Sequence, residues 1–227
     1  MSEREPGEPV AGTWRAQAVA RSLDPARARA ENRVQRYLDA ALEILNRETR
    51  RDFTVQEVVE RSGQSLRGFY QYFAGKHELL LALFEEAIAA TTDRLREAVA
   101  GATDPLVALH AFVAEYQRLC RATREGASVP EVPAPVVADF AHQLLTRHPD
   151  EASAAFLPLV ALLEELLDAA AAGGAIRAGL DHRRTAGVVL QAIMFNSFAP
   201  AISGSADDDP DALWDLLFLG LSDGAAG

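Results

Sequence analysis

The chain has 227 residues, of which 49% are hydrophobic and 7% aromatic, and its net charge is −11. Alanine and leucine are abundant and strand-like Val/Ile/Thr runs are absent, so we expect an all-α fold of one large or two small domains. No apolar run reaches the ~18 residues that a membrane span needs, and the polar N-terminus lacks the apolar core of a signal peptide.

Residues 1–27 show no apolar periodicity and contain three prolines, which predicts a mobile N-terminal arm. The arm also carries arginines, and a basic arm can enter the minor groove of DNA. An ordinary disordered tail is the simpler interpretation. From about residue 28 to Arg47, apolar residues recur at helical spacing and predict the first helix.

Residues 54–73 have the pattern of two short helices joined by a tight turn. Thr54 can cap the first helix, which ends at Ser62-Gly63, and Ser65 can cap the second. Two such helices, joined by a turn that contains glycine, form a helix-turn-helix whose second helix can enter a major groove. The alternative is a pair of amphipathic helices with an ordinary solvated face.

The second of these helices has two contrasting sides. Leu66, Phe69 and Phe73 share one face, so we expect them to pack on the preceding helix. The other sides carry groups that can reach phosphates and base edges, and a glycine that lets a DNA backbone come close; these residues are Arg67, Gly68, Tyr70, Gln71 and Tyr72. Lys76 follows at the expected start of the next helix, beside the same surface.

The stretch from about Asn32 to Ile88 resembles the N-terminal DNA-binding domain of the TetR family of transcriptional regulators. The most specific part is FYQYF at residues 69–73, followed by Gly75-Lys76. The resemblance implies phosphate contacts by Thr54, Tyr70 and Lys76. It places at or over the groove Ser65, Arg67, Gln71 and Tyr72.

The chain departs from the family pattern at Arg67-Gly68, where many members carry glycine and then threonine. The phosphate contact that this threonine usually makes is therefore missing. Arg67 can supply a base or phosphate contact in its place.

The acidic charge is unevenly distributed. Residues 1–80 carry 13 Lys/Arg and 12 Asp/Glu, a net charge of +1, whereas residues 81–227 carry 9 and 21, a net charge of −12. We therefore predict a helix-turn-helix DNA-binding domain at residues 28–80 and a separate helical bundle at residues 81–227. The resemblance implies that the second domain binds a ligand and forms a homodimer.

The second domain is predicted to begin with a long helix that ends near Gly101. After Asp104-Pro105, a helical stripe combines apolar and polar side chains. This pattern fits either a pocket wall or a core whose polar groups are hydrogen-bonded within the protein. The residues of the stripe are His110, Val113, Tyr116, Gln117 and Cys120. Further candidates for a pocket that takes an apolar or acyl-type effector are Phe140, Phe156, Met194, Phe195, Asn196 and Phe198. A helix from Asp150 to Ala172 should kink or break at Pro158.

The stretch LWDLLFLGL, which starts at Leu213, is apolar almost all round and must be covered on every side. We expect it to form, with the helix after Asp181, a four-helix bundle across a two-fold axis. The residues predicted at this interface are Val188, Ile193, Leu213, Trp214, Leu217, Phe218 and Leu221. Such a dimer presents two recognition helices about 34 Å apart to a palindromic site.

No catalytic pattern accompanies these features. The five histidines lack HExxH spacing, and the chain has no phosphate-binding glycine loop and no GxSxG. We therefore expect no cofactor, no metal and no enzyme activity, and the lone Cys120 is consistent with a reducing cytoplasm. The predicted function is a dimeric, ligand-responsive repressor that binds double-stranded DNA. The alternative is a helical small-molecule-binding enzyme with a fortuitous helix-turn-helix.

Overall fold

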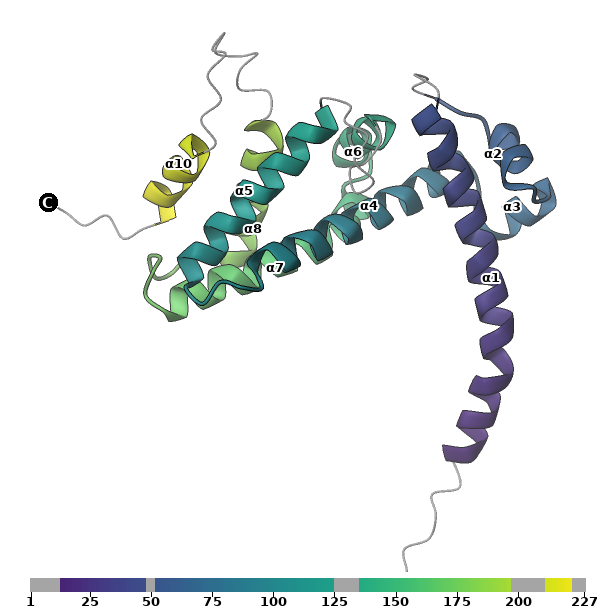
Figure 1. Cartoon of the computed structure of the whole chain (residues 1–227), viewed down its shortest axis with the longest axis horizontal. Helices are drawn as coiled ribbons and strands as arrows, with labels where there is room; N and C mark the ends of the chain where they lie inside the picture. Colours follow the sequence, from purple (N-terminus) through teal and green to yellow (C-terminus); the bar gives the residue numbers. More distant parts are fainter. Residues whose placement is uncertain (1–12, 48–51, 125–134, 197–210, 222–227) are drawn as a thin grey trace, which may run out of the picture.

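The structure, a computed structural model, describes residues 13–47, 52–124, 135–196 and 211–221. Every regular element within these ranges is an α-helix, which confirms the all-α prediction. At one end lie α1 (Thr13–Arg47), α2 (Val55–Ser62) and α3 (Leu66–Tyr72), and α4 (Lys76–Val99) leads from them into a bundle (Figure 1). The bundle also contains α5 (Pro105–Arg124), α6 (Pro135–Arg147), α7 (Pro149–Ala172), α8 (His182–Asn196) and α10 (Ala212–Leu221).

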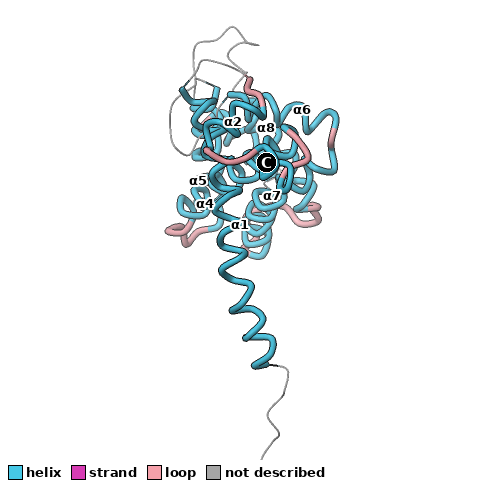
Figure 2. The backbone as a smooth tube through the Cα atoms, turned by 90° about the vertical axis from the view of Figure 1, so that its right-hand side faces the viewer, coloured by secondary structure: helices cyan, strands magenta, loops and turns pink. Residues whose placement is uncertain are grey.

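Helix α1 begins at Thr13, so residues 13–27 are helical and do not form the irregular arm that we predicted. Alanine and arginine are frequent here and favour a helix, but apolar periodicity cannot reveal a helix whose sequence shows no apolar period. Arg27 pairs with Glu31 at 2.7 Å, and Arg29 donates a hydrogen bond to the carbonyl of Pro25 at 2.8 Å. Figures 1 and 2 show this half of α1 projecting beyond the rest of the protein.

Helix α4 joins the two groups of helices without interruption. It buries Leu79, Leu83, Phe84 and Leu95, and a continuous set of buried side chains extends from α1 to α10. The predicted boundary after Leu80 therefore falls inside a helix, and any tilt of α4 must be transmitted to the helices at both of its ends.

Helix α7 runs through Pro158 without the break that the sequence suggested. Proline removes the hydrogen bond to the carbonyl four residues earlier, here that of Ala154. Both residues are exposed, so water can satisfy that carbonyl. Among the described residues, no helix combines the length and the apolar character needed to cross a membrane.

Candidate nucleic-acid interface and ligand groove

The predicted caps of the helix-turn-helix are present. The backbone N–H of Glu57 donates to Thr54 Oγ1 at 3.2 Å, and the backbone N–H of Thr54 donates to Glu57 Oε2 at 2.7 Å, which together form a capping box. Gly63 ends α2 with a φ of 64°, a conformation that favours glycine. The backbone N–H of Gly68 donates to Ser65 Oγ at 3.0 Å, which starts α3.

Tyr37 of α1 fixes the position of α3. Its hydroxyl donates a hydrogen bond to the backbone carbonyl of Ser65 at 2.9 Å. Its ring, only 1% exposed, meets those of Phe69 and Phe73 edge-on at centroid distances of 5.5 and 6.2 Å. Burial raises the pKa of Tyr37, so the hydroxyl keeps its proton and remains a donor. Sequence reasoning missed Tyr37 because its partners lie 28 or more residues away along the chain.

Gly68 makes room for Tyr37. A Cβ atom at this position would lie 2.9 Å from the Tyr37 hydroxyl oxygen and 3.1 Å from Ser65 Oγ. The small residue is therefore explained by contact between α3 and α1. That Gly68 also lets a DNA backbone come close stays a prediction.

The outer face of α3 forms a single ridge. Leu66, Arg67, Tyr70 and Gln71 are all exposed, Leu66 by 43% and Tyr70 by 57%. Residues three and four apart lie on one side of a helix, so these four side chains are neighbours. The ridge presents a guanidinium, an amide, a phenol and an apolar group to a common partner.

The predicted inner face of α3 is only partly correct. Phe69 and Phe73 are buried, as predicted, at 0% and 6% exposure. Leu66 is not buried, since it is 43% exposed on the outer face of α3. Tyr72, which was expected over the groove, is half-buried against the core.

Lys76, the first residue of α4, is held by neighbours within the protein. Its ammonium pairs with the Asp52 carboxylate and lies 4.8 Å from the centre of the Phe53 ring. Partial burial lowers the pKa of Lys76. The side chain remains 34% exposed, so it stands at the edge of the α3 surface with its charge already partly compensated.

A groove of about 480 Å³ opens between α6, α7 and α8. Its walls are mainly apolar and include Phe156, Leu190 and Met194, and a few polar side chains line it as well: His142, Thr146, Ser153 and Gln191. This volume and this mixture are typical of small-molecule sites. Of the residues that we predicted to bind a ligand, Phe156, Met194 and Phe195 line the groove.

The other predicted ligand residues lie elsewhere. Val113, Tyr116 and Phe140 are buried, and Asn196 is half-buried at the end of α8. His110 approaches Asp211 at 3.2 Å and the Trp214 ring at a centroid distance of 5.0 Å, so it belongs to the contact between α5 and α10. Phe198 lies outside the described residues.

Gln117 is a buried polar residue on α5. It is only 3% exposed, and neither its amide nitrogen nor its amide oxygen has a hydrogen-bond partner among the described residues. Leaving such a group unpaired costs roughly 1–3 kcal/mol. Nearby on the same helix, burial raises the pKa of Cys120 to about 12, so this thiol is unreactive.

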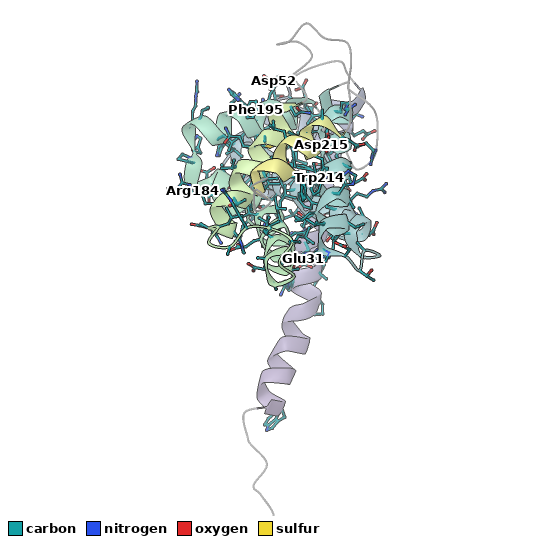
Figure 3. All side chains as sticks on the ribbon, turned by 90° about the vertical axis from the view of Figure 1, so that its left-hand side faces the viewer. Glu31, Asp52, Arg184, Phe195, Trp214 and Asp215 are labelled. Carbon is teal, nitrogen blue, oxygen red and sulfur yellow. The ribbon has the colours of Figure 1, made fainter. Side chains whose placement is uncertain are left out.

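Two of the predicted interface residues are buried within the chain itself, namely Ile193 at 0% and Leu213 at 7% exposure. Helix α10 lies against α5 and α8, so its apolar surface is partly covered without a second subunit. Val188 is 58% exposed, whereas Trp214, Leu217 and Phe218 are half-buried. The Leu221 side chain lies outside the described residues. Figure 3 looks onto this end of the bundle and labels Trp214 of α10 and Phe195 of α8.

Residues 38–83 match the sequence profile described as "Bacterial regulatory proteins, tetR family". No curated protein matches the sequence closely enough to count as a relative. Many solved structures share the fold over most of the chain, and three of them are described next.

The first is the fatty acid degradation regulator FadR from Bacillus halodurans, with a TM-score of 0.59, 21% identity, and coverage of 85% of this chain and 96% of that chain. FadR from Bacillus subtilis in complex with stearoyl-CoA has a TM-score of 0.58 and 18% identity, and the coverage is 83% and 97%. RolR in complex with resorcinol has a TM-score of 0.63 and 19% identity, and the coverage is 88% and 92%. The helix-turn-helix segment is thus similar to the tetR family of bacterial regulatory proteins, and the solved structures share the fold of the chain.

Proposed function

We propose that this protein is a dimeric repressor that binds a palindromic DNA operator and is released from it by an apolar effector. The observation that carries the proposal is the exposed ridge of Leu66, Arg67, Tyr70 and Gln71 on α3. Ser65 caps this helix, and Tyr37 anchors its first turn. A short helix fixed in this way can enter a major groove without further ordering, which favours specific binding.

The four ridge residues suit different parts of a duplex. Arg67 and Gln71 carry the groups that read guanine and adenine edges, and Tyr70 can donate to a phosphate. Leu66 lies one turn before Tyr70 and can meet the methyl group of a thymine. We assign phosphate contacts also to Thr54 and, at the edge of the surface, to Lys76.

Dimerisation in this proposal uses the outer faces of α8 and α10. Val188 on α8 is 58% exposed, and Leu216 on α10 is 70% exposed. Large apolar side chains that are exposed in this way favour burial against a second subunit. A two-fold arrangement of these helices presents two copies of α3 to half-sites about one helical turn apart.

The groove between α6, α7 and α8 is the proposed effector site. Its apolar walls, formed in part by Phe156, Met194 and Phe195, favour a hydrophobic or acyl-type compound. Solved structures of the same fold hold stearoyl-CoA and resorcinol, which are compounds with apolar parts. An effector that binds better when α4 is tilted away from the DNA-binding arrangement would lower operator affinity.

The alternative of a small-molecule-binding enzyme is less well supported. Two of the solved structures that share the fold are named as regulators, one of fatty acid degradation and one of transcription. A DNA reader also requires an exposed ridge such as that of α3, whereas an enzyme does not.

Selection of bound duplexes from a random pool tests the proposal directly. We expect an inverted-repeat consensus, bound by two copies of the chain with an affinity that falls steeply with salt. The control is the variant Arg67→Ala/Gln71→Ala, which should fold normally but enrich no consensus. A monomeric chain that enriches no sequence at low salt would overturn the proposal.

A further inference from the structure

A cluster of two histidines and a glutamate lies where the first turn of α4 meets the corner between α6 and α7. His77 is the second residue of α4, His148 separates α6 from α7, and Glu151 belongs to the first turn of α7. Glu151 Oε2 is 2.6 Å from His77 Nε2, and Glu151 Oε1 is 3.4 Å from His148 Nδ1. The two imidazole rings lie 4.7 Å apart between centroids.

The potential ligand atoms are close enough to surround one ion. One atom from each of the three residues lies within 4.8 Å of the other two. Ligand atoms around a tetrahedral zinc ion are roughly 3.4 Å apart, given metal–ligand bonds of about 2.0–2.2 Å. Small side-chain rotations would therefore complete the geometry.

The cluster is also accessible. The three side chains are between 39% and 44% exposed, so an ion could enter and water could complete its coordination. The Phe140 ring, 5.3 Å from the imidazole of His77, holds that imidazole from the side of α6.

The donor set selects a class of metal. Two imidazoles and one carboxylate suit zinc and related divalent transition metals, whereas Mg²⁺ and Ca²⁺ prefer oxygen ligands.

We propose that His77, His148 and Glu151 bind a divalent transition metal ion of the zinc class. From the sequence we predicted no metal, because no two histidines have the local spacing of a metal motif. His77 and Glu151 are 74 residues apart along the chain, and only the fold brings them together.

The position of the site gives the ion a regulatory role, and this part of the inference rests on the proposed DNA-binding function. His77 follows Lys76 directly and lies just beyond α3, whereas Glu151 belongs to the bundle. A bound ion would cross-link the start of α4 to the start of α7. If the ion changes the affinity for DNA, then by linkage DNA changes the affinity for the ion by the same factor.

Equilibrium dialysis of the full, chelator-treated chain against Zn²⁺ tests the site without DNA. We expect one Zn²⁺ per protomer, no displacement by excess Mg²⁺, and visible absorption bands when Co²⁺ is used instead. Glu151→Gln and His148→Gln should each weaken Zn²⁺ binding at least tenfold. Both positions are partly exposed, and circular dichroism would confirm that each variant retains its helices.

His182→Gln is the matched control. His182 also contacts a carboxylate, that of Asp168, but among the described residues no further metal-binding side chain completes a cluster with that pair. This variant should bind Zn²⁺ like the unmodified chain. The proposed site would be overturned if both cluster variants bound Zn²⁺ as the unmodified chain does. It would also be overturned if the unmodified chain bound no Zn²⁺ at millimolar concentration, and Glu151 and His77 would then form an ordinary ion pair. If Zn²⁺ binds equally well with and without the selected duplex, the regulatory role is overturned.

Discussion

The hydroxyl of Tyr37 and the backbone carbonyl of Ser65 are joined by a hydrogen bond of 2.9 Å that ties the first helix to the start of the third. The same carbonyl accepts the backbone N–H of Phe69 at 3.0 Å, within α3. A single peptide oxygen thus connects the helix that presents the DNA-facing ridge with the helix that supports it.

Removing this hydroxyl with Tyr37→Phe should lower the free energy of unfolding by about 1 kcal/mol, the usual net contribution of such a bond. The ring contacts with Phe69 and Phe73 would remain, so the effect isolates the hydrogen bond. Urea unfolding with an unchanged m value measures it. Tyr70→Phe, at an exposed phenol, is the matched control and should leave stability unchanged.

Gly68→Ala should destabilise the protein, although alanine favours helices by about 1 kcal/mol relative to glycine. The added Cβ would lie 2.9 Å from the Tyr37 hydroxyl oxygen. This oxygen cannot move away without breaking its hydrogen bond to the Ser65 carbonyl. In a Tyr37→Phe background the same change should be neutral or stabilising. Thermal melts of the four proteins give the coupling energy, and a stabilising Gly68→Ala in the unmodified chain would contradict the predicted clash.

Tyr70→Ala and Gln71→Ala should separate phosphate contact from base reading. The first should weaken binding to all sequences and reduce the slope of log affinity against log salt by about one. The second should relax preference at one base position, with a loss of about 1–3 kcal/mol on the best site. Fluorescence anisotropy at graded salt, combined with repeated selection, distinguishes the two. An unchanged salt slope in Tyr70→Ala would show that Tyr70 makes no phosphate contact.

Leu66 should contact a thymine methyl group, because it is the exposed apolar member of the ridge. Replacing each operator thymine in turn by uracil removes one methyl group and nothing else. At one position per half-site, this replacement should weaken the binding free energy by about 0.8 kcal/mol, the usual value for burying one such group. The Leu66→Ala variant should lose most of this sensitivity. If no replacement changes the operator affinity of the unmodified chain, Leu66 does not contact a thymine methyl group.

Gln117→Met should raise the stability of the protein without effector by about 1–3 kcal/mol, because methionine fills a similar volume and leaves no polar atom unpaired. Urea unfolding measures the change. Gln143→Met, at an exposed position of α6, is the control and should have little effect. A destabilised Gln117→Met would indicate that buried water or a bound molecule satisfies the amide.

Local signals in the sequence were reliable where the physics is local. Thr54, Gly63 and Ser65 cap or end helices through atoms within three residues, and these were predicted correctly. The burial of Phe69 and Phe73 followed from helical spacing alone. The same reasoning failed for residues 13–27, which are helical although their sequence shows no apolar period, and for Leu66, which is exposed.

The sequence by itself determined the all-helical fold, the helix-turn-helix and the polar face of its second helix, because caps, propensity and periodicity act over a few residues. Only the tertiary structure decided which distant side chains meet, such as Tyr37 with Ser65 and His77 with Glu151. Such contacts depend on how whole helices pack, and helix packing is set by many weak interactions summed over the entire core.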